Sequence, residues 1–79
     1  MKKVSDLERI TMTPGVMQGQ PCIRGMRITV AMIVDTIAAG RSAAEILAGY
    51  PELESEDIEQ ALHFASRKVR GAEYELVEA

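Results

Sequence analysis

The stretch PGVMQGQPCIRGMRIT, from Pro14 to Thr29, sets three glycines, two prolines and two arginines among apolar residues. Glycine permits backbone angles that other residues resist, and proline fixes its own, so we expect this loop to hold a defined shape. It presents Arg24 and Arg27 just before a helix start. Two interpretations stay open: the loop is a recognition surface, or it is a rigid N-terminal clasp whose arginines are merely solvated.

A short strand is predicted immediately before this loop. Ile10-Thr11-Met12 alternates apolar and polar residues and stops at Thr13-Pro14-Gly15. Either Cys22-Ile23 or Arg27-Ile28 can return beside it. A two-stranded ribbon is barely stable alone, so helices or a second subunit have to cover it.

Three helices are predicted after the loop, from apolar residues at helical spacing and from end signals. They are expected over 30–39 with Thr29 as N-cap, over 43–49 with a capping box of Ser42 and Glu45, and over 56–70 with Ser55 as N-cap. The predicted fold is therefore all-α: a small three-helix, homeodomain-like or helix-turn-helix bundle with a short N-terminal β element.

The 79 residues are expected to form one domain, 1–79, because a chain of this length builds a single core. Residues 10–28 supply the strand and the rigid loop, residues 29–71 the bundle, and residues 72–79 an acidic tail that is mobile in isolation. Much aliphatic surface on so short a chain favours a homodimer.

Two large apolar side chains do not fit the predicted core stripes. Phe64 lies away from the stripe of the third helix, and Met32 lies opposite Val34 and Ile37 on the first helix. Such residues are either isolated surface side chains or parts of an interface. The third-helix stripe is Ile58, Ala61, Leu62, Ala65 and Val69. The candidate partner or dimer interface is Ile10, Met12, Met32, Phe64, Tyr74 and Leu76.

The sequence offers little for catalysis. His63, the one histidine, falls on the solvent face of its helix and has no partner at metal-ligand spacing. The glycine-rich loop fits neither the phosphate-loop pattern nor the dinucleotide-binding pattern. We therefore expect no enzyme, no catalytic residues, no metal, no cofactor and no small-molecule substrate.

The single cysteine, Cys22, excludes an internal disulfide and suits a reducing cytoplasm. No apolar run is long enough to cross a bilayer. The expected location is the cytoplasm, without a membrane contact.

Nucleic-acid binding is disfavoured by the net charge of −3 but not excluded by it. The second and third helices have helix-turn-helix spacing, but the residues that would meet the bases are mostly acidic, and phosphates repel acids. A better candidate surface is formed by Arg24, Arg27 and Arg41, because these side chains can contact phosphates.

A longer pattern resembles a known family. Gly19-Gln20-Pro21-Cys22-Ile23-Arg24-Gly25-Met26-Arg27-Ile28, and later Tyr50-Pro51 and Glu56-Asp57-Ile58, match the domain of unknown function 433 family over about residues 10–65. The family often has Thr where this chain has Met26. The resemblance implies a homeodomain-like helical domain that acts as the antitoxin of a toxin–antitoxin pair, beside a toxin similar to PIN-domain ribonucleases. It carries over no catalytic residue.

Three functions follow as alternatives. The first is a dimeric antitoxin that sequesters a small ribonuclease-like toxin encoded nearby and binds its own operator DNA. The second is a helix-turn-helix DNA-binding regulator without a toxin, and the third is a generic protein-interaction module. The tail with Tyr74 and Leu76 either orders on the partner or frays without consequence.

Overall fold

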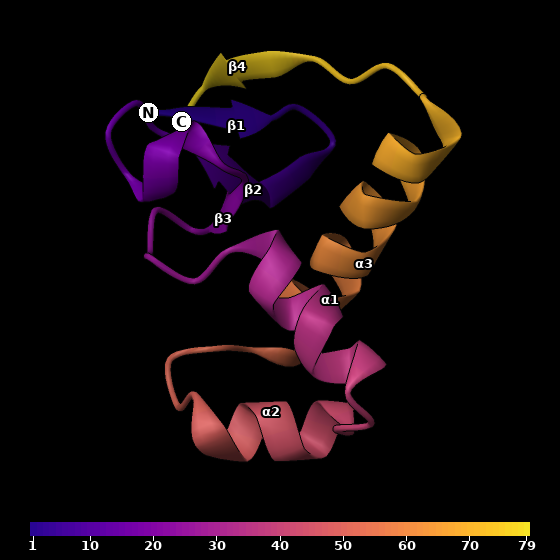
Figure 1. Cartoon of the computed structure of the whole chain (residues 1–79). Helices are drawn as coiled ribbons and strands as arrows, with labels where there is room; N and C mark the ends of the chain where they lie inside the picture. The colour runs from indigo at the N-terminus through magenta and orange to yellow at the C-terminus, as the bar shows by residue number, and fades with distance from the viewer.

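The computed structural model, which describes residues 1–79, joins a four-stranded antiparallel sheet to three helices (Figure 1). The chain order is β1 (Lys2–Val4), β2 (Leu7–Met12), a short turn at Met17–Gly19, β3 (Cys22–Ile23), α1 (Val30–Ala38), α2 (Ala43–Gly49), α3 (Ser55–Arg70) and β4 (Leu76–Glu78). In space the strands follow the order β3-β2-β1-β4. The prediction of an all-α fold is therefore wrong, because the fold is mixed α/β.

The sheet is larger than predicted because both ends of the chain contribute strands. The predicted strand Ile10-Thr11-Met12 is the second half of β2, which pairs with Cys22 and Ile23. Strand β4 pairs antiparallel with β1, and Leu76 lies opposite Val4. Residues 72–79, expected to be a mobile tail, thus end in a sheet strand.

The helices begin and end close to their predicted positions because their capping signals are local. Thr29 caps α1 by accepting a hydrogen bond from the Met32 N–H at 3.0 Å, and Ser42 and Glu45 form the capping box of α2. Gly71, with φ of 72°, ends α3 in the left-handed conformation that glycine adopts readily. One cap differs: the N-cap of α3 is Glu54, not Ser55.

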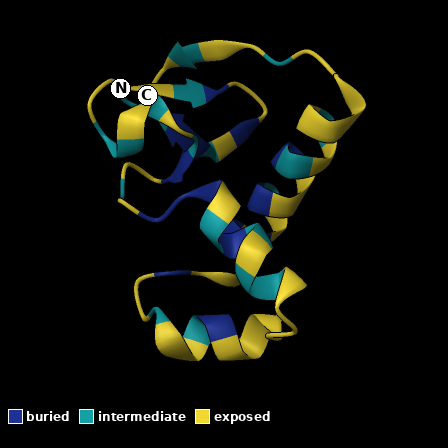
Figure 2. Cartoon of the chain, viewed as in Figure 1, coloured by how far each residue is buried: buried dark blue, intermediate teal, exposed yellow.

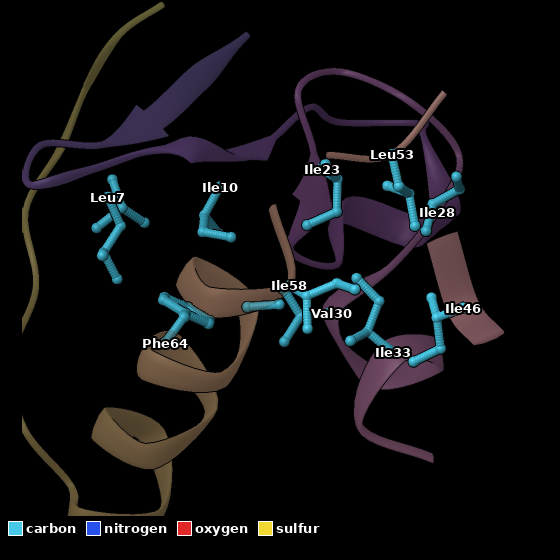
Figure 3. Close-up of a cluster of buried hydrophobic side chains, with 12 residues drawn as sticks. Leu7, Ile10, Ile23, Ile28, Val30, Ile33, Ile46, Leu53, Ile58 and Phe64 are labelled. Atoms are coloured by element: carbon cyan, nitrogen blue, oxygen red, sulfur yellow. The ribbon is translucent and has the colours of Figure 1, made fainter. Parts of the chain in front are cut away.

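The hydrophobic core lies between the sheet and the helices (Figures 2 and 3). Phe64 of α3 is only 2% exposed and lies with Leu7 and Ile10 between α3 and β2 (Figure 3). Tyr74 packs edge-on against the Phe64 ring, with centroids 5.0 Å apart. Phe64 and Ile10, expected in an interface between chains, are therefore core residues.

Helix α3 is rotated relative to the prediction. Ile58 and Ala61 are buried as expected, but Leu62 is 41% exposed and Val69 is 89% exposed. The sheet covers the face that carries Phe64, a face that would meet solvent in a bundle of three helices alone. The missed sheet therefore explains the misplaced stripe.

We expect Phe64→Ala to lower the free energy of unfolding by about 3–5 kcal/mol, because it leaves a cavity beneath the sheet. Leu62→Ala, the matched control on the same helix, should lower it by less than about 1 kcal/mol, because Leu62 is partly solvated. Urea unfolding followed by circular dichroism measures both values. Equal losses would contradict the rotation of α3.

Candidate functional site

A buried carboxylate, that of Asp57, joins three separate parts of the chain. Its side chain is 0% exposed and lies in the first turn of α3. The Arg24 guanidinium donates to both oxygens, from Nε at 3.0 Å and from Nη2 at 2.9 Å. Arg9 of β2 donates from Nη1 at 2.9 Å, and the Glu54 N–H donates at 2.8 Å. We call Asp57, Arg9, Arg24 and Glu54 the Asp57 cluster.

The Pro14–Thr29 loop positions Arg24 through a left-handed turn. Arg24 and Gly25 have φ of 44° and 74°. The turn is fastened to β2, because the Arg24 N–H donates to the Arg9 carbonyl at 2.7 Å and the Gly25 N–H donates to Thr11 Oγ1 at 2.8 Å. A side chain at Gly25 would be strained by this φ and would approach Met1 Sδ to 3.1 Å. For Arg24, these contacts favour the clasp interpretation over recognition.

Asp57 stays ionised inside the protein. Burial by itself would raise the pKa of its carboxyl, but the hydrogen bonds from Arg24, from the Glu54 N–H and from Arg9 outweigh burial, so the pKa lies below its ordinary value. The hydrogen bond to Asp57 correspondingly raises the pKa of Arg24. Asp57 and Arg24 therefore keep their charges across the physiological pH range.

The three arginines predicted to contact nucleic acid do not act as one group. Arg24 is held by Asp57, and its Nη2 also donates to the Glu52 carbonyl at 2.7 Å. Arg27 and Arg41 are exposed and form no ion pair within the chain. They border different surface depressions, Arg27 beside the Gly15–Gln20 loop and Arg41 between α1 and α2.

The first turns of α3 are poorly suited to reading bases. The Gln60 side-chain oxygen accepts a hydrogen bond from the Arg9 N–H at 2.9 Å, and Asp57 is buried. Glu56 forms an ion pair with Arg9 Nε at 3.3 Å. Apart from Ser55, the residues that a helix-turn-helix would direct toward DNA are thus acidic or already bonded within the chain.

Exposed carboxylates surround this end of α3, and we call them the acidic end: Glu52, Glu54, Glu56 and Glu59. Arg9 pairs with Glu54 at 2.6 Å and with Glu56, whereas Glu52 and Glu59 form no ion pair within the chain. Arg9 and Arg24 both pair with the buried Asp57, so they do not neutralise the exposed carboxylates fully. The acidic end therefore carries a net negative charge. A rigid negative surface of this kind attracts cationic partners.

The remaining titratable candidates lie apart from one another. His63 is exposed on α3. Cys22 is buried, and burial raises the pKa of its thiol. No three His, Cys, Asp or Glu side chains gather as they would around a metal ion. No helix in the structure is both long enough and apolar enough to cross a bilayer.

The candidate interface residues are not brought together as a surface. Ile10 and Phe64 are buried, and Met12, Met32 and Tyr74 are half-buried against the core. Leu76, at 38% exposed, is the one member that meets solvent substantially. Two of these side chains, Ile10 and Phe64, are instead buried between β2 and α3, and Tyr74 of the C-terminal segment packs on Phe64.

Sequence analysis missed the pairing of Arg9 with Asp57. The available signal was helical spacing: Asp57 and Phe64 are seven residues apart and share one face of α3. This spacing predicts a buried carboxylate only if the shared face of α3 is known to pack against another element. The sequence did not reveal that the sheet packs there.

Comparisons with known proteins agree with the resemblance noted in the sequence. The family model described as "Protein of unknown function (DUF433)" matches residues 10–65. A crystal structure of a DUF433 member protein from Anabaena variabilis is 38% identical, with a TM-score of 0.75 over 80% of this chain and 62% of that one. The uncharacterized protein y4eO of Sinorhizobium fredii is 34% identical over 58 residues, which are 73% of this chain. The match covers 26% of that relative, so this chain corresponds to about a quarter of its length.

We expect Asp57→Asn to lower the free energy of unfolding by about 2–4 kcal/mol, because it leaves two guanidinium groups without their shared carboxylate. The matched control is Glu56→Gln, which removes one of the two exposed partners of Arg9 and should lower the free energy of unfolding by less than about 1 kcal/mol. Urea unfolding at pH 7 compares them. Similar losses for the two variants would contradict a central role for Asp57.

Low pH should reduce the free energy of unfolding by protonating the Asp57 carboxylate. Because the pKa of Asp57 is lower in the folded state than its ordinary value of 3.8, its contribution is complete well above that pH. The contribution is lost as the pH falls through the folded-state pKa. We expect the free energy of unfolding to fall less steeply between pH 6 and pH 3 in Asp57→Asn than in the unmodified chain. Parallel pH profiles would show that Asp57 does not contribute.

Proposed function

The chain belongs to the DUF433 family, and we propose that it is a non-catalytic, antitoxin-like module that binds and blocks a small basic ribonuclease encoded beside it. The observation that carries this proposal is the acidic end. Several carboxylates are displayed there on a helix start that the Asp57 cluster holds rigid. A ribonuclease needs cations to hold its RNA, so an acidic protein surface can occupy the place of the phosphates.

Rigidity supports this role. Arg9 and Arg24 bind Asp57 in the first turn of α3 and so fix the start of that helix. Arg24 also donates to the Glu52 carbonyl, which fixes the loop before α3. A surface that is ordered before binding loses little conformational entropy on association. Paired carboxylates such as Glu54 are held in place by Arg9, while Glu52 and Glu59 remain free to meet a cation.

The same features support a protein partner more than a nucleic acid. Phosphates would be repelled by the acidic end, and the potential base reader Gln60 is already bonded to the Arg9 N–H. A second candidate function, DNA binding, has support from the exposed and unpaired Arg27 and Arg41. The buried thiol of Cys22 suits a reducing compartment, so we place the activity in the cytoplasm.

The experiment is co-expression of the chain with the adjacent open reading frame, followed by affinity capture and measurement of the dissociation constant. We expect a stable complex that weakens by about tenfold or more in the double variant Glu52→Lys/Glu59→Lys, and that also weakens with added salt. Both side chains are exposed and unpaired, so the fold should be unaffected.

The matched control is Glu73→Lys/Glu75→Lys, which makes the same charge change near the C-terminus and should leave affinity nearly unchanged. If only the control variant loses affinity, the site lies on the C-terminal segment. If neither variant loses affinity, the acidic end is not the contact. If the chain does not bind the adjacent gene product, and instead binds operator DNA through Arg27 and Arg41, DNA binding replaces the antitoxin-like function.

A further inference from the structure

A second surface lies on the other half of α3, away from the acidic end. Helices α1 and α3 pack side by side (Figure 1) and leave a groove of about 310 Å³ between them. Its lining includes the apolar Val30, Val34, Ala65 and Val69 and two charged side chains, Asp35 and Lys68. No segment of this chain covers it.

Helix α3 is apolar on two faces, and only one of them is buried in this chain. Phe64 and Ala61 face the core, whereas Leu62, Ala65 and Val69 recur at three- and four-residue spacing along a flank of the helix. Val69 is 89% exposed, the largest exposure among the large hydrophobic residues. An isolated exposed valine is ordinary, but one that stands beside an apolar groove is a feature of an interface.

We propose that the α1–α3 groove is the homodimer interface of this protein and that a second copy of the chain occupies it. The two charged side chains supply the argument for a copy. Asp35 on α1 and Lys68 on α3 are both exposed, and no ion pair joins either of them within the chain.

A two-fold axis along the groove places Asp35 of one chain opposite Lys68 of the other, and the reverse, so two ion pairs form at the rim of one apolar contact. Such an interface is self-complementary, as a symmetric dimer requires. The Val69 of each chain then enters the groove of the other.

A strongly basic partner would gain no electrostatic attraction at this groove, because the charges of Asp35 and Lys68 cancel. The complement of such a partner is the acidic end, at the opposite end of α3. Dimerisation through the groove therefore leaves both acidic ends open, so the inference does not depend on the proposed function.

The test is the mass of the full chain in solution by light scattering after size exclusion and by sedimentation equilibrium over a range of concentrations. The unmodified chain should be dimeric. Val69→Asp should weaken the dimer by more than about tenfold, because it places an unpaired charge in the apolar contact. The fold should survive, since Val69 is exposed, and circular dichroism checks this.

A charge exchange tests the pairing itself. Asp35→Lys and Lys68→Asp should each weaken the dimer, and the double variant should regain most of the lost affinity. Arg70→Glu, a charge reversal two residues from Lys68 and on another side of α3, should leave the dimer unchanged. A chain that is monomeric at every concentration, a Val69→Asp variant that remains dimeric, or a double variant that recovers nothing would each overturn the proposal.

Discussion

The arrangement of sheet and helices depends on one buried carboxylate. Asp57 is shielded from water and accepts four hydrogen bonds, two from Arg24, one from Arg9 and one from the Glu54 N–H. Replacing such a group by apolar side chains of equal volume is often neutral for stability, so its value is not stability alone. We interpret it as a positional constraint, because its donors come from β2, from the Pro14–Thr29 loop and from the residue before α3, so a shift of α3 against the sheet breaks these hydrogen bonds.

Local signals in the sequence were sufficient for the helices and insufficient for the sheet. A cap such as Thr29 acts within one turn of backbone, so the residues beside it identify the start of α1. Strands β1 and β4 have three residues each, too few for an alternating pattern to be recognised. Strand β4 becomes a strand only because β1, at the other end of the chain, lies beside it, and no short window of sequence contains that information.

The fixed shape of the Pro14–Thr29 loop was predictable, but the direction of the Arg24 side chain was not. The glycines and prolines of Pro14–Thr29 predict a fixed backbone shape, and the structure has one. Whether Arg24 meets a ligand or another part of the chain depends on a carboxylate 33 residues away. The same long-range dependence misplaced Phe64, whose face packs against β2, a strand that the local pattern revealed only from Ile10 onward.

Pairing between the two ends of the chain has a consequence for biosynthesis. Strand β1 is made before the other elements of this fold and β4 after them, so one of the two edges of β1 is completed only when β4 is available, and the Ala79 N–H donates to the Met1 carbonyl at 3.3 Å. During translation the β1–β2 hairpin therefore leaves the ribosome with an open edge, and it keeps that edge until residues 76–78 emerge. This order of events makes closure of the sheet a late and non-local step, with an unpaired strand exposed to neighbouring nascent chains in the interval.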